Sequence, residues 1–291
     1  MSTVTAAQRQ VLKGVKEAPA LVIFLIFVSE IGLNWLYVNF LIEPFSVPAS
    51  LTDGLVQPIF VLSFLKVAFI ILGVVLWIGK FHNHDLGATF VKFRTGIITA
   101  FFLWAFLQLC MIGIGALSAS SGALFTGLTE KNPLFYLGTF TLFAFSKALY
   151  DEVIYRGLVL PQFHIKARRF INLPSHYTLT IAIVLSQIIY LIIQMPLIST
   201  AHDGESSLGL TFLSLFLLSL LNAVVYIRTH NIFVSVGIHA LWFYPLFIVN
   251  SSIQQEYLIA AVGLGLLALW PMLPKQDKRK RVWPTQEQRI R

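Results

Sequence analysis

Long apolar segments dominate this sequence of 291 residues and restrict its possible folds more than any other feature. A helix needs about 20 apolar residues to cross a bilayer, and eight segments reach that length. They are residues 18–42, 57–79, 97–118, 133–160, 178–198, 208–227, 232–250 and 257–273. Charged residues make up 12% of the chain, about half the usual share of about 25% in soluble domains. We therefore predict an all-α fold, a polytopic membrane helix bundle of about eight transmembrane helices.

The distribution of basic residues predicts the orientation of these helices. Short loops rich in Lys and Arg stay on the cytoplasmic side, and most of the 21 Lys and Arg residues lie in the two terminal segments and alternate loops. The other loops hold Lys131 beside several acids. Eight spans place both termini on one side, so we expect both to be cytoplasmic. Residues 275–291 form a basic cytoplasmic tail, which is typical of attraction to anionic membrane lipids.

The same distribution argues against other classes of protein. The net charge of +8 is spread thinly over several segments, so no basic patch for nucleic acid is expected. The single cysteine, Cys110, excludes a disulfide framework and a cysteine-based metal site. No linker separates a soluble part, so we interpret residues 1–291 as a single membrane domain, in a bacterial plasma membrane or an organelle membrane.

One predicted span carries four charged residues, Lys147, Asp151, Glu152 and Arg156. Residues four apart share a helix face, so Lys147 is expected to meet Asp151, and Glu152 to meet Arg156. One interpretation is structural, with two ion pairs that neutralise each other inside the bundle. The other is functional, because charge at membrane depth usually marks a site.

A functional site requires polar partners from other spans, and His239 is the principal candidate. It lies about 12 Å into the bilayer when counted from the inner loop, and Asp151 lies at about 15 Å when counted from Pro161, where we expect its helix to end. The two can meet, although a buried histidine is often only a hydrogen-bonded core residue. Gln194 counts out deeper, at about 24 Å. Further polar residues in the spans are Glu30, Asn34, Lys66, Gln108, Gln187 and Asn222.

These residues resemble the motifs of the CPBP intramembrane proteases, which include type II CAAX prenyl endopeptidases and bacteriocin self-immunity proteins. The run Asp151-Glu-Val-Ile-Tyr-Arg156 is similar to the family's E-E-x-x-x-R motif, Tyr190-Leu-Ile-Ile-Gln194 to F-x-x-x-H, and His239-Ala-Leu-Trp-Phe243 to H-x-x-x-N. The resemblance covers about residues 130–250, the motif-bearing core. It implies that Asp151 and the residue at 194 activate a water, that His239 and the residue at 243 stabilise the oxyanion, and that Glu152 and Arg156 are site residues.

Three of the four reactive positions depart from the family pattern. Asp151 stands for the first Glu, and a displacement of about 1 Å can cost about 100-fold in rate. Gln194 stands for a histidine, and an amide is not a base at neutral pH. Phe243 stands for the asparagine and removes an oxyanion donor, a change that costs about 2.7–4 kcal/mol in other enzymes.

No cofactor and no metal are expected. Catalytic zinc takes three protein ligands, and Asp151, Glu152 and His239 would make only a poor set. His82, His84 and Asp85 have a metal-like spacing, but we interpret them as a solvated loop.

Three functions therefore remain open. The chain can be an impaired family member that binds a membrane peptide, a lipid or a partner protein, and this is the function we favour. It can be an active endopeptidase that cleaves a prenylated or membrane-embedded peptide. A transporter is the least supported, because the halves lack matching broken helices.

Overall fold

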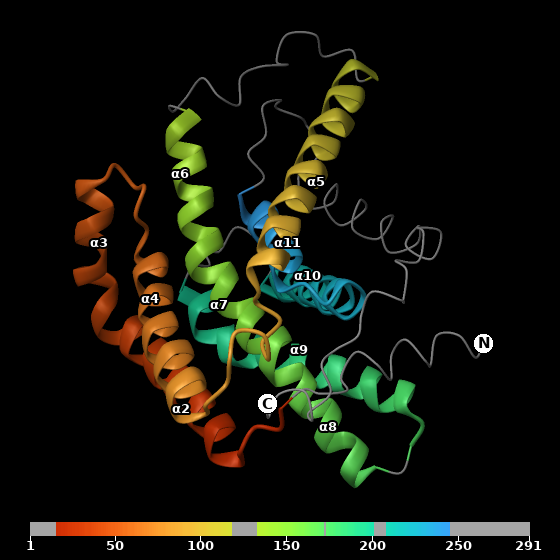
Figure 1. Cartoon of the computed structure of the whole chain (residues 1–291). Coiled ribbons are helices and arrows are strands. Elements are labelled where there is room, and N and C mark those ends of the chain that lie inside the picture. The colour runs from red at the N-terminus through yellow and green to blue at the C-terminus, as the bar shows by residue number, and fades with distance from the viewer. Residues whose placement is uncertain (1–15, 118–132, 172, 201–207, 245–291) are drawn as a thin grey trace.

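The computed structural model describes residues 16–117, 133–171, 173–200 and 208–244, which form helices joined by turns and short loops, with no strand among them (Figure 1). Several helices run on through segments with wider, π-type turns. The first continuous helix consists of α2 (Ala20–Leu36), η1 (Tyr37–Leu41) and α3 (Ile42–Leu51). The second consists of α4 (Pro58–Lys66) and η2 (Val67–Ile78), and α5 (Phe90–Leu117) follows.

The second half of the described chain is built around one long helix. It comprises α6 (Pro133–Phe143), η4 (Ala144–Ala148), α7 (Leu149–Asp151), η5 (Glu152–Val159) and α8 (Leu160–Phe170). The chain continues with α9 (Ser175–Thr200), α10 (Leu208–Thr229) and α11 (Ile232–Phe243). The long helix runs diagonally through the molecule, with α2–α4 on one side of it, α10 and α11 on the other, and α9 crossing behind it (Figure 1).

Five of the described helices are long and apolar enough to cross a membrane. They are Ala20–Val47, Pro58–Ile78, Phe90–Gly113, Tyr177–Ser199 and Thr211–Thr229. Each overlaps a predicted span, so within the described residues the prediction of an all-helical fold is confirmed, and the five apolar helices fit a membrane protein.

The predicted count of eight spans and the cytoplasmic location of both termini remain predictions. The predicted span 133–160 lies in the long charged helix, which is not among the five. The described part of the span 232–250 is a shorter apolar helix, Ile232–Phe243. The span 257–273 and the basic tail 275–291 lie outside the described residues.

Helix α2 carries polar residues on its buried face and large apolar residues on its exposed face. Its buried positions follow helical spacing and include two polar residues, Glu30 and Asn34. Its outward positions are large and apolar, and both Leu21 and Phe24 are 61% exposed. A water-soluble helix would present the opposite arrangement. Apolar side chains on the outer face fit contact with lipid, and polar side chains at this depth face the interior.

The long helix is buried on all sides where it carries the charges. Every residue from Tyr150 to Gln162 is buried, which is expected of a helix at the centre of a bundle rather than at its surface. The expectation that this helix ends at Pro161 is wrong, because it continues to Phe170. The π-type turns end at Val159. Where π-type turns give way to α-helical turns, one backbone carbonyl is left without a helical partner. Pro161, which has no backbone N–H to donate, therefore fits at this point.

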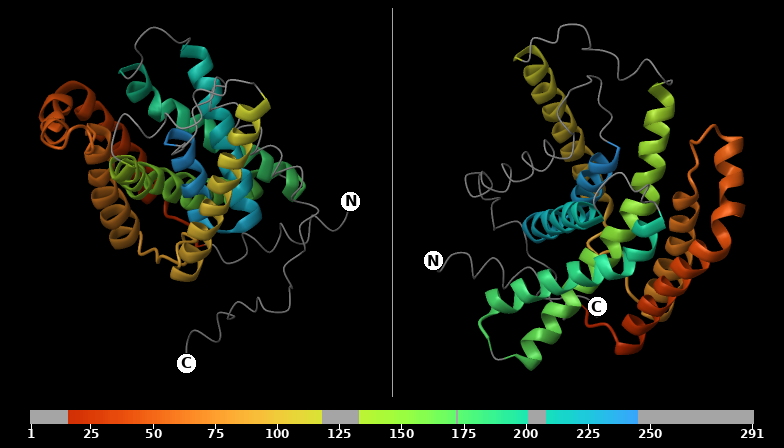
Figure 2. Two further views of the ribbon diagram at one scale, coloured as in Figure 1. Left: turned by 90° about the horizontal axis from the view of Figure 1, so that it is seen from above. Right: turned by 180° about the vertical axis from the view of Figure 1, so that it is seen from behind.

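Close helix contacts fix the elements that surround this centre. Gly96 in α5 lies against Phe233, and Gly237 in α11 lies against Ala100, so closely that a Cβ on either glycine would come within 2.6 Å of the neighbour's Cβ. Small residues allow helix backbones to approach in this way. Helices α8 and α9 pack against each other and run in roughly opposite directions, as the right-hand view in Figure 2 shows. These contacts hold α9 and α11 beside the charged segment.

Candidate functional site

The centre of the bundle holds the four motif residues that the sequence places at this depth. Asp151 ends α7, Glu152 and Arg156 lie in η5, and His239 lies in α11. Their exposed fractions are 0% for both acids, 1% for Arg156 and 2% for His239. Buried charges are stable only when they are paired and hydrogen-bonded, so their partners define the site.

Glu152 is the centre of the first cluster. Its Oε1 accepts a hydrogen bond from Asn222 Nδ2 at 3.1 Å and lies 2.9 Å from His239 Nδ1. Its Oε2 lies 3.3 Å from Arg156 Nε, which is the pair expected from the spacing of four residues. One carboxylate therefore joins the long helix to α10 and α11.

Arg156 extends this cluster toward α9 and α10. Its guanidinium donates to the Ser219 backbone oxygen at 3.0 Å and to Ser219 Oγ at 2.9 Å. Ser219 Oγ in turn donates to Gln187 Oε1. The guanidinium also lies 5.4 Å from the centre of the Tyr190 ring, within the range of a cation–π interaction. Arg156 therefore holds helices together and does not project into open space.

Asp151 is the centre of a second cluster. Its Oδ2 accepts from the Lys147 ammonium, the other pair expected from the spacing, and from Tyr190 OH at 3.2 Å. Lys147 Nζ also donates to Gln194 Oε1 at 3.3 Å. The sequence predicted that Gln194 lies deeper in the bilayer than Asp151, yet it reaches the same site through Lys147. The lysine lies between the two residues that the family resemblance assigns to water activation.

A third ion pair, which the sequence did not predict, borders the second cluster. Glu30 Oε1 lies 3.5 Å from Lys66 Nζ, and Glu30 Oε2 accepts from Tyr155 OH at 2.7 Å. Gln194 Nε2 donates to Glu30 Oε1 at 3.5 Å, so the amide connects both ion pairs. The signal available in the sequence was one acid and one base, each near the middle of one of two consecutive predicted spans. Asn34 adds a bond to the Ile193 backbone oxygen at 2.9 Å.

Aromatic rings enclose the imidazole of His239 on the side where the resemblance expects an asparagine. The Phe243 ring lies one helical turn further along α11, with its centre 5.5 Å from that of the imidazole. Phe143 lies 5.8 Å from the imidazole and 5.2 Å from Phe243, measured between ring centres. Aromatic carbon supplies no hydrogen-bond donor at this position.

The chemistry available here is that of charge pairing and hydrogen bonding. Asp151 Oδ1, Arg156 Nη1 and Asn222 Oδ1 are three of the buried polar atoms that have no hydrogen-bond partner in the described part of the chain. Buried polar atoms of this kind are rare in folded proteins and call for an explanation. They offer one donor and two acceptors to a polar group that enters the site.

A metal ion does not fit among these residues. The cluster offers a single imidazole, and its Nδ1 contacts Glu152. The cationic groups of Lys147 and Arg156 already neutralise the two carboxylates. A divalent cation would have to displace these ion pairs before it could bind.

Comparison with known families agrees with the motifs. Residues 133–244 match the family model of Rce1-like type II CAAX prenyl endopeptidase. This region belongs to the CPBP/CAAX protease family. Neither a curated protein nor a solved structure matches the chain. The matched region begins at Pro133, the first residue of α6, and ends one residue after α11. It contains the six motif residues Asp151, Glu152, Arg156, Gln194, His239 and Phe243.

The family match covers residues 133–244, and the apolar helices fit an integral membrane protein. It identifies the scaffold and leaves the individual roles of Asp151, Glu152, Arg156 and His239 as predictions. Sequence reasoning missed Ser219 and the contacts of Tyr155, Tyr190 and Asn222 at the candidate site. Tyrosine and serine occur throughout apolar helices, so only their position in the fold distinguishes them.

Proposed function

We propose that this chain is a catalytically impaired member of the CAAX protease family that binds a membrane-bound peptide or protein partner within its helix bundle. The observation that carries the proposal is the position of Lys147, whose ammonium contacts both Asp151 and Gln194. A general base needs a free lone pair within reach of the proton that it removes. Here the Lys147 cation contacts Asp151 Oδ2 and, by stabilising the ionised carboxylate, makes it a weaker base, and an amide replaces the imidazole beside it.

The remaining half of the reaction machinery is altered as well. Family resemblance places an oxyanion donor at position 243, where this chain has a phenylalanine packed near His239. Losing one such donor costs about 2.7–4 kcal/mol, or about 100- to 1000-fold in rate. Together with the change at Gln194, this loss supports a binding role over turnover.

The unpartnered polar atoms support binding of a peptide in particular. Asp151 Oδ1 and Asn222 Oδ1 can accept from backbone N–H groups, and Arg156 Nη1 can donate to a carbonyl. A peptide segment within the bilayer must satisfy its backbone groups inside protein. We expect membrane lipids to surround the outer face and the basic tail to contact anionic headgroups, in a bacterial plasma membrane or an organelle membrane.

The alternative function is an active endopeptidase that cleaves a prenylated or membrane-embedded peptide. A specific contact favours it, because Glu152 Oε1 lies 2.9 Å from His239 Nδ1. In this mechanism Glu152 would serve as the base while His239 stabilises the developing negative charge. The Glu152–Arg156 ion pair weakens the idea, since it also engages this carboxylate.

Peptide cleavage by purified variants distinguishes the two functions. We expect the parent chain to show no cleavage of peptide or prenylated-peptide pools above background. The triple variant Asp151→Glu, Gln194→His and Phe243→Asn is expected to gain proteolysis, and the gain should disappear when Glu152→Ala or His239→Ala is added. Cleavage by the parent that is lost in Asp151→Ala, Glu152→Ala and His239→Ala would establish the enzyme instead. The exposed Asn39→Ala variant serves as the unaffected control.

A further inference from the structure

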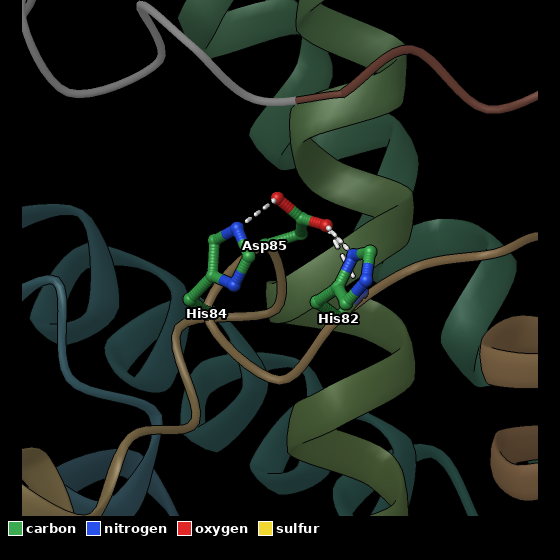
Figure 3. A group of neighbouring side chains, drawn as sticks. All are labelled: His82, His84 and Asp85. Carbon is green, nitrogen blue, oxygen red and sulfur yellow. Dashed lines mark hydrogen bonds and ion pairs between the residues drawn. The ribbon is translucent and has the colours of Figure 1, made fainter. Parts of the chain in front are cut away.

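A compact turn outside the bundle centre brings together two imidazoles and a carboxylate. The turn lies between η2 and α5 and contains His82, His84 and Asp85 (Figure 3). His82 Nδ1 lies 3.5 Å from Asp85 Oδ2, and His84 Nε2 lies 3.1 Å from Asp85 Oδ1. One ligand atom from each residue lies within 4.8 Å of the others. No other group of this kind occurs among the residues that the structure describes.

These distances agree with the geometry of a metal centre. Zinc binds imidazole nitrogen and carboxylate oxygen at about 2.0–2.2 Å, so two ligands of one tetrahedral ion lie about 3.4 Å apart. The two nitrogen–oxygen distances in the turn, 3.1 and 3.5 Å, lie on either side of this value. They reach different oxygens of Asp85, so the carboxylate would bind the ion through both oxygens or turn to present one. The widest separation, within 4.8 Å, has to close by up to about 1.4 Å to match this geometry. The His82 and His84 side chains are 73% and 43% exposed, so their rings can rotate to close it.

The carboxylate is held in place before any ion arrives. Asp85 Oδ2 accepts from the His82 backbone N–H at 2.9 Å, and the Asp85 side chain is only 10% exposed. The Asp85 backbone N–H bonds back to the His82 oxygen at 2.9 Å, and the Ala88 N–H to the Asn83 oxygen at 2.8 Å. Gly87 closes the turn with a φ of +76°, a conformation that glycine adopts without strain. Fixed orientation of a ligand by hydrogen bonds of this kind strengthens metal binding.

Simple ion pairing accounts less completely for this arrangement. The two imidazole rings are stacked, with centres 5.4 Å apart and planes inclined by 22°. One ion pair needs a single imidazole beside Asp85, yet a second ring faces the other oxygen of the same carboxylate. A divalent ion, by contrast, uses two neutral imidazoles and one carboxylate together.

We propose that His82, His84 and Asp85 bind one divalent transition-metal ion of the zinc class at the rim of the helix bundle. Imidazole ligands favour zinc and its first-row neighbours over calcium or magnesium. Three protein ligands leave a fourth position for water or another ligand. This inference departs from the sequence-based interpretation of the segment as a solvated loop.

The neighbouring contacts indicate what the ion would stabilise. Leu86 follows Asp85 directly and is buried. A Cβ built on Gly157, the residue after Arg156 in the motif helix, would lie 2.9 Å from the Leu86 backbone oxygen. The turn therefore packs on the CAAX-protease motif helix, and metal binding would hold it there. The expected role is structural support of the site rather than participation in chemistry.

Titration with cobalt tests the proposal directly. The protein is purified without a polyhistidine tag, stripped of metal, and titrated with Co²⁺ alone while its visible absorption is recorded. The parent is expected to bind one equivalent, and Zn²⁺ is expected to displace it. Loss of groups that only orient a ligand already weakens metal binding about 10- to 100-fold. His82→Ala, His84→Ala and Asp85→Asn, which remove direct ligands, are therefore each expected to weaken binding by about tenfold or more.

The matched control is Asn83→Ala, which alters the same turn but removes no ligand. It should bind Co²⁺ as the parent does. As a second measurement, Zn²⁺ should raise the unfolding temperature of the parent and of Asn83→Ala but not that of the three ligand variants. Absence of Co²⁺ binding by the parent, or equal binding by the double variant His82→Ala with His84→Ala, would overturn the proposal.

Discussion

The Glu152 carboxylate and the His239 imidazole lie 2.9 Å apart, although 87 positions separate them in the chain. The contact joins η5 to α11 at a place where neither residue has access to solvent. It completes a cluster in which Arg156 contacts the other oxygen of the same carboxylate. Arg156 and His239 thus share the Glu152 carboxylate, so a substitution at Glu152 affects both of them.

Neutralising Glu152 should destabilise the fold. The substitution Glu152→Gln keeps the size of the side chain but leaves the buried Arg156 without its carboxylate. Removing one partner of a buried ion pair typically costs about 3–5 kcal/mol. Unfolding of the purified protein in mixed detergent micelles measures the loss. A change below about 1 kcal/mol would show that other groups already balance Arg156.

Removing Lys147 and Asp151 together should cost less than removing either alone. Lys147→Met leaves a buried carboxylate unpaired and should destabilise by about 3–5 kcal/mol. Adding Asp151→Asn removes the charge while keeping an acceptor for Tyr190 OH, so the double variant should recover much of this loss. The same unfolding measurement gives the coupling free energy.

The exposed ion pair of Arg169 and Glu17 serves as the control for that cycle. Its side chains are 60% and 41% exposed, and exposed pairs contribute about 0–1 kcal/mol. Arg169→Met should therefore change stability by less than about 1 kcal/mol. Equal losses for Lys147→Met and Arg169→Met would contradict the importance of burial at the Asp151 cluster.

Gly157 should not tolerate a side chain. A Cβ at this position would lie 2.9 Å from the Leu86 backbone oxygen and 3.0 Å from Ile232 Cδ1. Such overpacking costs about 1–3 kcal/mol, so Gly157→Ala should lower the unfolding temperature. Gly32→Ala is the matched control, because nothing lies within 4 Å of its Cβ. It should be neutral or stabilise the helix by up to about 1 kcal/mol.

His164 should make stability depend on pH. It lies in α8, outside the five candidate spans, and burial lowers its pKa below the ordinary value of 6.5, with a smaller contribution from the Arg168 cation. The unfolded chain therefore takes up a proton at a higher pH than the folded chain. The contribution to stability is complete above about pH 6.5 and is lost as the pH falls through the lowered pKa of the folded state.

Replacing this histidine with a group that does not titrate should reduce the effect. In His164→Gln, the loss of stability between about pH 6.5 and more acidic conditions should be smaller than in the parent. Unfolding temperatures across this range measure the difference. Identical pH profiles for the two proteins would mean that His164 does not contribute.

Sequence alone determined the class of the fold and the pairs within one helix. Spans of about 20 apolar residues leave few alternatives to membrane helices, and a helix places residues four apart on one face. Lys147 therefore had to lie near Asp151, and Glu152 near Arg156, wherever their helix packs. The order of the three motifs also indicated the family, which the match to residues 133–244 confirms.

Only the tertiary structure decided which helices share the charges. The pairing of Glu30 with Lys66, the reach of Gln194 to both ion pairs and the binding of Arg156 to Ser219 depend on the tilt and rotation of separate helices. Periodicity fixes which face of a helix is polar, but not which neighbour it meets or at what depth. Pro161 illustrates the same limit, because burial and a change of helical register allow a helix to continue where local preference predicts its end.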